Sequence, residues 1–131
     1  MPFTCPECST SGSLNITHKI ELPPDSSWDE ITVQIVKCSR CRFQGVAVYE
    51  ESRRGALDSE IWHHVGYRVG KDELKALQKA IKQCPAPSNP RCRCSTHLSL
   101  GRTSSKTGRW EGVKGVSWET SFPMRLVRKR R

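Results

Sequence analysis

Hydrophobic and polar residues alternate with a period of two over residues 14–22 and again over residues 31–38. Successive side chains of a strand point to opposite faces, so each stretch predicts a half-buried β-strand. Two prolines and an aspartate break the pattern between them, as expected of a turn. A third apolar, β-branched run covers residues 43–49, where we expect Gly45 to mark a bulge. The alternating apolar positions are Leu14, Ile16, Ile20, Leu22, Ile31, Val33 and Ile35.

The period becomes helical after Gly70, in a stretch that leads to Cys84. Asp72 and Glu73 stand in the first turn of this predicted helix, where the helix dipole favours acidic side chains, and lysines stand in its last turns. Pro85 cannot continue a helix, so we expect the helix to end just before it. The apolar positions that predict its buried face are Leu74, Leu77 and Ile81.

Two other stretches have weaker patterns. Residues 50–70 mix charged residues with three glycines and predict a loop with a short strand. Residues 102–131 are rich in Gly, Ser, Lys and Arg, and we expect a weak hairpin around Lys114 and Gly115. No apolar run approaches the roughly 20 residues that a membrane-spanning helix needs.

Seven cysteines and one histidine stand at spacings typical of metal ligands. Only 35% of the residues are hydrophobic, and small folds with thin cores often depend on metals or disulfides. Seven cysteines cannot all pair as disulfides, and in the reducing compartment that we expect, clustered cysteines bind metal more often than they form bridges. Together with one histidine they supply two complete sets of four zinc ligands. The sets are Cys5, Cys8, Cys38 and Cys41, and Cys84, Cys92, Cys94 and His97.

The first set consists of two CxxC pairs, over residues 5–8 and 38–41. Each two-residue gap lets both thiolates of a tight turn reach one ion, and the spacer of 29 residues allows two strands to run out and back. Residues 3–50 thereby resemble the zinc-ribbon superfamily, which implies a three-stranded antiparallel sheet with one zinc ion and says little about the task. That superfamily often carries Gly after the second Cys of each turn. Ser9 and Arg42 stand there, so we expect turns of altered geometry.

Asp29 and Glu30 stand at the start of the second predicted strand, beside the expected hairpin tip. Their place is similar to that of the acidic pair of transcript-cleavage elongation factors, which helps to hold a catalytic metal at a polymerase active site. Trp28 and the preceding prolines are not part of that pattern. We favour the simpler explanation, a polar pair at the start of a strand, and keep a polymerase-associated role as a lesser alternative.

The second set joins the end of the predicted helix to a compact turn with the spacing C-x-C-x2-H. Three prolines between Cys84 and Cys92 reduce the entropy lost in forming this site. His97 needs an acceptor for its other ring N–H, which the sequence does not name. The alternatives are that Cys92 and Cys94 bind metal in trans or form a redox pair. Four protein ligands leave no open position at either site, so we expect two structural zinc ions.

No catalytic frame is recognisable, and we expect a protein that is not an enzyme. The zinc-deaminase pattern needs His-x-Glu, which occurs at none of the histidines. The hypothesis of a metal nuclease built from His63, His64, Asp58 and Glu60 is weak, because the two adjacent histidines of a strand would point to opposite faces. His18 is in phase with the apolar positions of the first strand, and we expect a core or edge histidine because both ligand sets close without it.

The net charge of +9 is unevenly distributed, because residues 98–131 carry nine basic and two acidic residues, a charge of +7. A cationic chain favours a polyanionic partner such as nucleic acid. The alternatives are a tail that aids solubility or binds an acidic protein. Lys71, Lys75 and Lys79 add a basic stripe on the predicted helix, either simply solvated or facing phosphates. We expect phosphate contacts and base stacking from Lys106, Arg109, Trp110, Lys114, Trp118, Arg125, Arg128, Lys129, Arg130 and Arg131.

These patterns predict an α+β protein in three parts: a zinc ribbon in residues 1–52, a connecting loop, helix and second zinc module in residues 53–101, and a basic tail in residues 102–131. The expected function is to bind nucleic acid as an accessory subunit of a larger assembly. The main alternative is a protein–protein adaptor with purely structural zinc, since four Trp residues suit protein interfaces. With no secretory signal in the first residues, we expect a cytoplasmic protein with no membrane partner and no small-molecule substrate.

Overall fold

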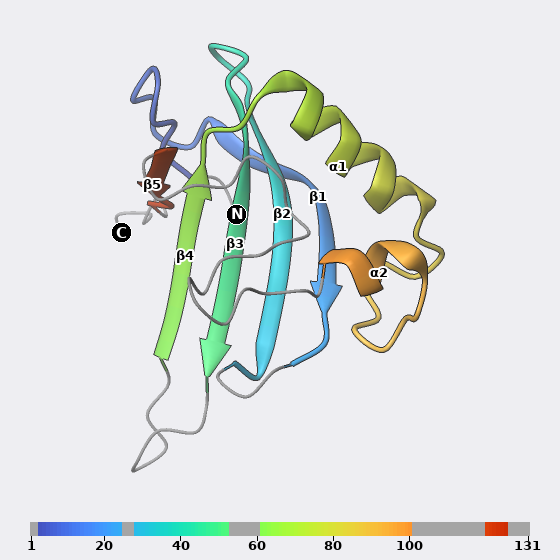
Figure 1. The fold of residues 1–131 in the computed structure, drawn as a ribbon. Coiled ribbons are helices and arrows are strands. Elements are labelled where there is room, and N and C mark those ends of the chain that lie inside the picture. The colour runs from blue at the N-terminus through green and yellow to red at the C-terminus, as the bar shows by residue number, and fades with distance from the viewer. Residues whose placement is uncertain (1–2, 25–27, 53–60, 101–119, 126–131) are drawn as a thin grey trace.

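A computed structural model describes residues 3–24, 28–52, 61–100 and 120–125 of the chain. Its centre is a five-stranded antiparallel sheet in which the strands follow one another in chain order, β1-β2-β3-β4-β5 (Figure 1). Two helices lie on the β1 side of the sheet, away from β5. The strands are β1 (Leu14–Leu22), β2 (Glu30–Cys38), β3 (Gln44–Ser52), β4 (Ile61–Tyr67) and β5 (Ser121–Pro123), and the helices are α1 (Lys71–Gln83) and α2 (Ser95–Leu100).

A bulge in β1 divides its apolar side chains between the two faces of the sheet. Pairing with β2 steps from Ile16–Val36 to His18–Ile35, so β1 has one extra residue, Thr17, between these pairs. A shift of one residue moves every following side chain to the opposite face. The regular alternation of residues 14–22, which by itself predicts one buried face, therefore serves two separate cores.

The first core lies between the sheet and α1. Residues of β1, β2 and β3 pack there against the buried stripe of α1 and against the end of α2. The predicted helix is confirmed: α1 ends at Gln83, just before Cys84 and Pro85, and it buries the three expected apolar positions. The buried residues of this core are Ile20, Leu22, Ile31, Val33, Ile35, Val46, Val48, Leu74, Leu77, Ile81, Cys84 and Leu100.

The second core lies on the opposite face, at the end of the sheet that carries Cys5 and Cys38. Gly66 of β4 is paired with Phe122 of β5, and a Cβ atom at Gly66 would lie 2.3 Å from the Phe122 ring. The absence of a side chain at Gly66 therefore makes room for the aromatic ring that anchors β5. The buried residues of this core are Phe3, Cys5, Leu14, Val36, Cys38, Ala47, Phe122 and Met124.

The sheet is larger than the three strands predicted from the sequence. Residues 61–67, in the stretch expected to be a loop with a short strand, form β4, which pairs with residues 46–52 of β3. Residues 121–123, expected to belong to the tail, form β5. The prediction of a bulge at Gly45 is wrong, because β2 and β3 pair without a register shift and Gly45 lies opposite Val36. A Cβ atom at Gly45 would lie 2.9 Å from the carbonyl oxygen of Tyr67, so close approach of β4 explains this glycine.

Two candidate metal centres

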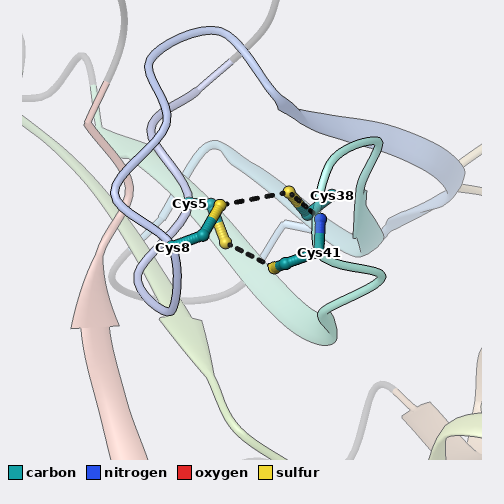
Figure 2. A group of neighbouring side chains, drawn as sticks. All are labelled: Cys5, Cys8, Cys38 and Cys41. Carbon is teal, nitrogen blue, oxygen red and sulfur yellow. Dashed lines mark hydrogen bonds between the residues drawn. The ribbon is translucent and has the colours of Figure 1, made fainter.

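The first candidate centre is formed by two turns at one end of the sheet. Cys5 and Cys8 come from the turn that precedes β1, whereas Cys38 ends β2 and Cys41 lies in the turn before β3; the four side chains converge (Figure 2). The Sγ atoms of Cys5 and Cys41 are 3.6 Å apart and those of Cys8 and Cys38 are 3.8 Å apart. Zinc–sulfur bonds of about 2.3 Å in a tetrahedron require sulfur atoms about 3.8 Å apart, so the four thiols fit a zinc ion. We call this set the four-cysteine centre.

The two turns keep a regular geometry although neither has Gly after its second cysteine. Ser9 and Arg42 adopt positive φ angles of 59° and 67°, the left-handed conformation that glycine adopts without strain. Backbone N–H groups of Glu7 and Arg40 point at the sulfur atoms of Cys5 and Cys38, at 3.4 and 3.3 Å. The expectation of altered turns is therefore wrong: the conformation is retained, and two non-glycine residues bear its strain.

The thiols of the four-cysteine centre differ in their electrostatic environment. Burial raises the pKa of Cys5 to about 12. Burial also acts to raise the pKa of Cys38, but contacts with the Ser13 hydroxyl and with the N–H groups of Cys41 and Arg40 outweigh it and bring that pKa down to about 6. Only thiolates bind zinc, so the metal must displace a proton that burial holds on Cys5, while Cys38 offers a thiolate near neutral pH.

The second candidate centre joins α1 to α2. Cys84 directly follows α1, Cys92 and Cys94 lie in the connecting segment, and His97 lies within α2. The Sγ atom of Cys84 is 3.9 Å from that of Cys92 and 3.2 Å from His97 Nδ1, and Cys94 Sγ is 3.3 Å from the same nitrogen. These four ligand atoms lie within 4.8 Å of one another, so the predicted set of three cysteines and one histidine is brought together. We call this set the histidine-containing centre.

The structure supplies the hydrogen-bond acceptor for His97 that the sequence did not name. His97 Nε2 lies 2.9 Å from the carbonyl oxygen of Glu21 in β1, so the ring donates from Nε2 and presents Nδ1 to the metal. The backbone N–H of Glu21 donates to the carbonyl oxygen of Pro87 at 2.8 Å. The histidine-containing centre thus docks on the outer edge of β1, where it satisfies both backbone groups of one residue.

A further hydrogen bond joins the two helices. The Thr96 hydroxyl donates to the carbonyl oxygen of Ala80 at 2.9 Å, near the end of α1 where carbonyl groups lack helical partners.

The thiols of the histidine-containing centre differ in their pKa values. Burial raises the pKa of Cys84 to about 11. The backbone N–H and the ring of His97 lower the pKa of Cys94 to about 6, which favours a thiolate ligand at neutral pH.

Both ligand sets therefore fit structural zinc. Each offers four nitrogen or sulfur atoms from two chain segments, and each is complete without a solvent molecule. A catalytic zinc site keeps one position for water or substrate, whereas four protein ligands fill a tetrahedron. The two centres thus support two structural zinc ions, one of which joins two turns that are distant in the sequence and the other of which joins α1 to α2.

Other residues singled out from the sequence are dispersed. His18 lies on β1 outside both ligand sets, with Thr17 Oγ1 3.0 Å from its Nδ1. Adjacent His63 and His64 point to opposite faces of β4: His63 packs edge-on against Trp28, and His64 lies on the face of the second core. Asp58 and Glu60 lie outside the described residues.

The acidic pair Asp29 and Glu30 lies at the start of β2, an inner strand of the sheet. Asp29 and Glu30 are half-buried, and the Asp29 backbone N–H donates to the Glu51 carbonyl oxygen at 2.8 Å. Of the residues expected to contact nucleic acid, the structure describes Arg125, which is exposed and whose carbonyl oxygen accepts a hydrogen bond from Thr4 N–H at 3.0 Å. The others lie outside the described residues: Lys106, Arg109, Trp110, Lys114, Trp118, Arg128, Lys129, Arg130 and Arg131.

Comparison with protein-family models, curated proteins and solved structures finds no match to this chain. The resemblance to zinc ribbons therefore depends on the two CxxC pairs and on the geometry of the centre they form. In the described part of the chain, no helix is long and apolar enough to span a membrane.

Proposed function

We propose that the protein is a non-enzymatic zinc protein that binds nucleic acid as an accessory component of a larger assembly. The observation that supports a structural role for the metals is that each centre has four protein ligands in contact. Such zinc ions fix the shape of a small protein and leave no position for an activated water. Function then resides on the surface that the two centres hold in place.

Charge supports a polyanion as the partner. The chain has a net charge of +9, and most of it stands in residues 98–131. Lysine and arginine side chains that neutralise phosphates release counterions, which gives affinity without sequence specificity. β5 holds the start of the basic C-terminal run against the sheet, because Phe122 and Met124 are buried and Arg125 lies beside Thr4.

Binding to labelled duplex and single-stranded DNA and RNA, measured at two salt concentrations, tests the proposal. The full chain is compared with a chain truncated after Arg125, because truncation before β5 would remove the buried Phe122 and Met124. We expect micromolar or tighter binding that weakens with salt and is reduced by truncation. Absent binding, or binding insensitive to salt, would contradict the proposal.

A protein–protein adaptor is the second candidate. Two large apolar side chains favour it, because Trp62 is 60% exposed on β4 and Leu98 is 61% exposed on α2. Exposed Trp side chains often anchor protein interfaces. Full metal loading combined with no affinity for any of the four nucleic acids would leave this function as the one that the structure supports.

A further inference from the structure

The antiparallel strands sort charged residues toward opposite ends of the sheet. β2 begins with an acidic residue and ends with Lys37 and Cys38, and β3 follows Arg42 and ends in an acidic stretch. Because neighbouring strands run in opposite directions, the acidic end of β3 pairs with the acidic start of β2, as Glu30 opposite Glu51 shows. Among the described residues, this acidic end contains Glu21, Asp29, Glu30, Glu50 and Glu51.

The opposite end of the sheet is basic and coincides with the four-cysteine centre. Arg40 and Arg42 are exposed on either side of Cys41, and Lys37 is exposed just before Cys38. These residues are far in sequence from Arg125, yet the hydrogen bond between Thr4 N–H and the Arg125 carbonyl oxygen brings Arg125 to the same end. We call Lys37, Arg40, Arg42 and Arg125 the knuckle surface.

Nearby acidic residues only partly offset this charge. Glu7 forms a salt bridge with Arg68, in which the Arg68 Nε lies 2.7 Å from the Glu7 carboxylate. The two charges cancel. Asp72 and Glu73 lie at the start of α1 next to Lys71. A zinc ion with four thiolates has a net charge of −2, so the four cations of the knuckle surface leave an excess of +2, which Lys71, Asp72 and Glu73 together reduce to +1.

We propose that the phosphate backbone of a nucleic acid binds on the knuckle surface. Charge complementarity favours the knuckle surface, where three cations are exposed on one turn and its flanks, over the opposite end of the sheet, where the described strand residues are mainly acidic. This inference rests on the proposed function and deepens it, because it adds Lys37, Arg40 and Arg42 to a contact surface otherwise assigned to the C-terminal third. The zinc centre holds these cations in place on a rigid turn.

The test compares two full-length variants that each lose three positive charges. Lys37→Gln, Arg40→Gln and Arg42→Gly remove three of the four cations of the knuckle surface, and glycine suits the positive φ at residue 42. Lys75→Gln, Lys79→Gln and Lys82→Gln remove three exposed lysines from α1 as the matched control. Arg125 stays in both, so the contribution of the tail is unchanged. Affinity for labelled duplex and single-stranded DNA is measured over a salt series, and zinc content is measured by native mass spectrometry.

We expect the knuckle variant to lose roughly 10- to 100-fold in affinity, with a salt slope reduced by about 2 to 3, since each phosphate contact contributes about 0.7 to 0.9. The α1 variant should keep its affinity, and both should retain two zinc ions. Equal losses in the two variants, or an unchanged slope in the knuckle variant, would overturn the inference while leaving the proposed function intact. Zinc loss confined to the knuckle variant would show that Arg40 and Arg42 stabilise the metal centre instead of binding phosphates, and this outcome would also overturn the inference. If the unmodified protein binds no nucleic acid, the proposed function itself fails.

Discussion

At the scale of single residues, two positions show how strongly the metal centre constrains the backbone. Ser9 and Arg42 adopt the left-handed conformation, which costs a non-glycine residue about 1–2 kcal/mol. Gly12 has a φ angle of 75° in the same region, and no atom lies within 4 Å of the position of a Cβ there. Substitutions at these three residues therefore report on backbone strain, and at Gly12 the new side chain has no packing effect because the space is open.

Replacement of Arg42 by glycine is expected to raise the free energy of unfolding by about 0.5–1 kcal/mol, because relief of the strain outweighs the entropy that the unfolded chain gains. The reverse change, Gly12→Ala, should lower the free energy of unfolding by a similar amount, because alanine must adopt the same positive φ and its methyl group meets no other atom. Chemical denaturation of the zinc-loaded protein measures both. Destabilisation by Arg42→Gly would contradict this account.

His64 is a second residue whose environment leads to a prediction. Its ring lies edge-on to Phe3 and Tyr49, and its Nε2 donates to the Gln34 side-chain oxygen at 2.7 Å. Burial lowers the pKa of His64 from 6.5 to about 4. The folded state thus prefers the neutral ring, and the resulting stability is complete above pH 6.5 and is lost as the pH falls through about 4.

We expect the free energy of unfolding of the unmodified protein to fall more steeply between pH 6.5 and pH 4 than that of His64→Gln. Zinc release in acid affects both proteins, so only the difference between the two pH profiles reports on His64. Denaturation at a series of pH values with excess zinc supplies these profiles. Parallel profiles would show that His64 does not titrate differently on unfolding.

At the scale of secondary-structure elements, packing against a strand distant in the sequence explains why β5 forms, which the local sequence pattern does not predict. β5 is only three residues long, yet it is held because Phe122 lies over Gly66. The Phe122 ring also packs edge-on against Phe43, with centroids 5.6 Å apart. Besides its backbone pairs with β4 and the buried Met124, the strand is therefore held by one aromatic residue and the space that a glycine leaves for it.

Gly66→Ala should destabilise the protein by about 1–3 kcal/mol, because the new methyl group and the Phe122 ring cannot occupy the same space. Hydrogen exchange should show increased opening of the β4–β5 pairs, with the β2–β3 pairs unchanged. A matched change on β3, Ala47→Gly, removes a buried methyl group without adding volume and should leave β5 in place. Undisturbed β5 amides in Gly66→Ala would contradict this explanation.

At the scale of the whole molecule, the metal centres have different structural tasks. The four-cysteine centre joins the first turn to the β2–β3 turn, whereas the histidine-containing centre joins the two helices and docks them on the edge of β1. Because His97 donates to Glu21, zinc binding at the histidine-containing centre is linked to the covering of that edge. Removing either metal should therefore affect a different part of the protein.

Native mass spectrometry should find two zinc ions in the unmodified protein and one in each of Cys5→Ser and Cys84→Ser. In Cys84→Ser we expect faster hydrogen exchange at the Glu21 amide, whose acceptor Pro87 belongs to the segment between Cys84 and Cys92, with the β2–β3 pairs still protected. Cys5→Ser is the matched control and should keep the Glu21 amide protected. Loss of both ions from one substitution, or equal exchange at Glu21 in the two variants, would contradict separate tasks.

The sequence by itself determined the features that depend on short spacings. The two CxxC pairs, the C-x-C-x2-H turn and the period of α1 all involve neighbouring residues, and the structure confirms them, as it does the strands β1 and β2. The prediction that residues 31–38 form a half-buried strand is wrong, because residues 31–36 of β2 are buried on both faces, between the two cores. Only the tertiary structure decided how distant segments meet. The bulge at Thr17 assigns β1 to two cores, β4 and β5 gain their order from partners elsewhere in the chain, and Glu21 becomes the acceptor for His97. Pairing between strands depends on energies summed over the whole sheet, which no local pattern contains, and the same pairing gathers the basic residues around the four-cysteine centre.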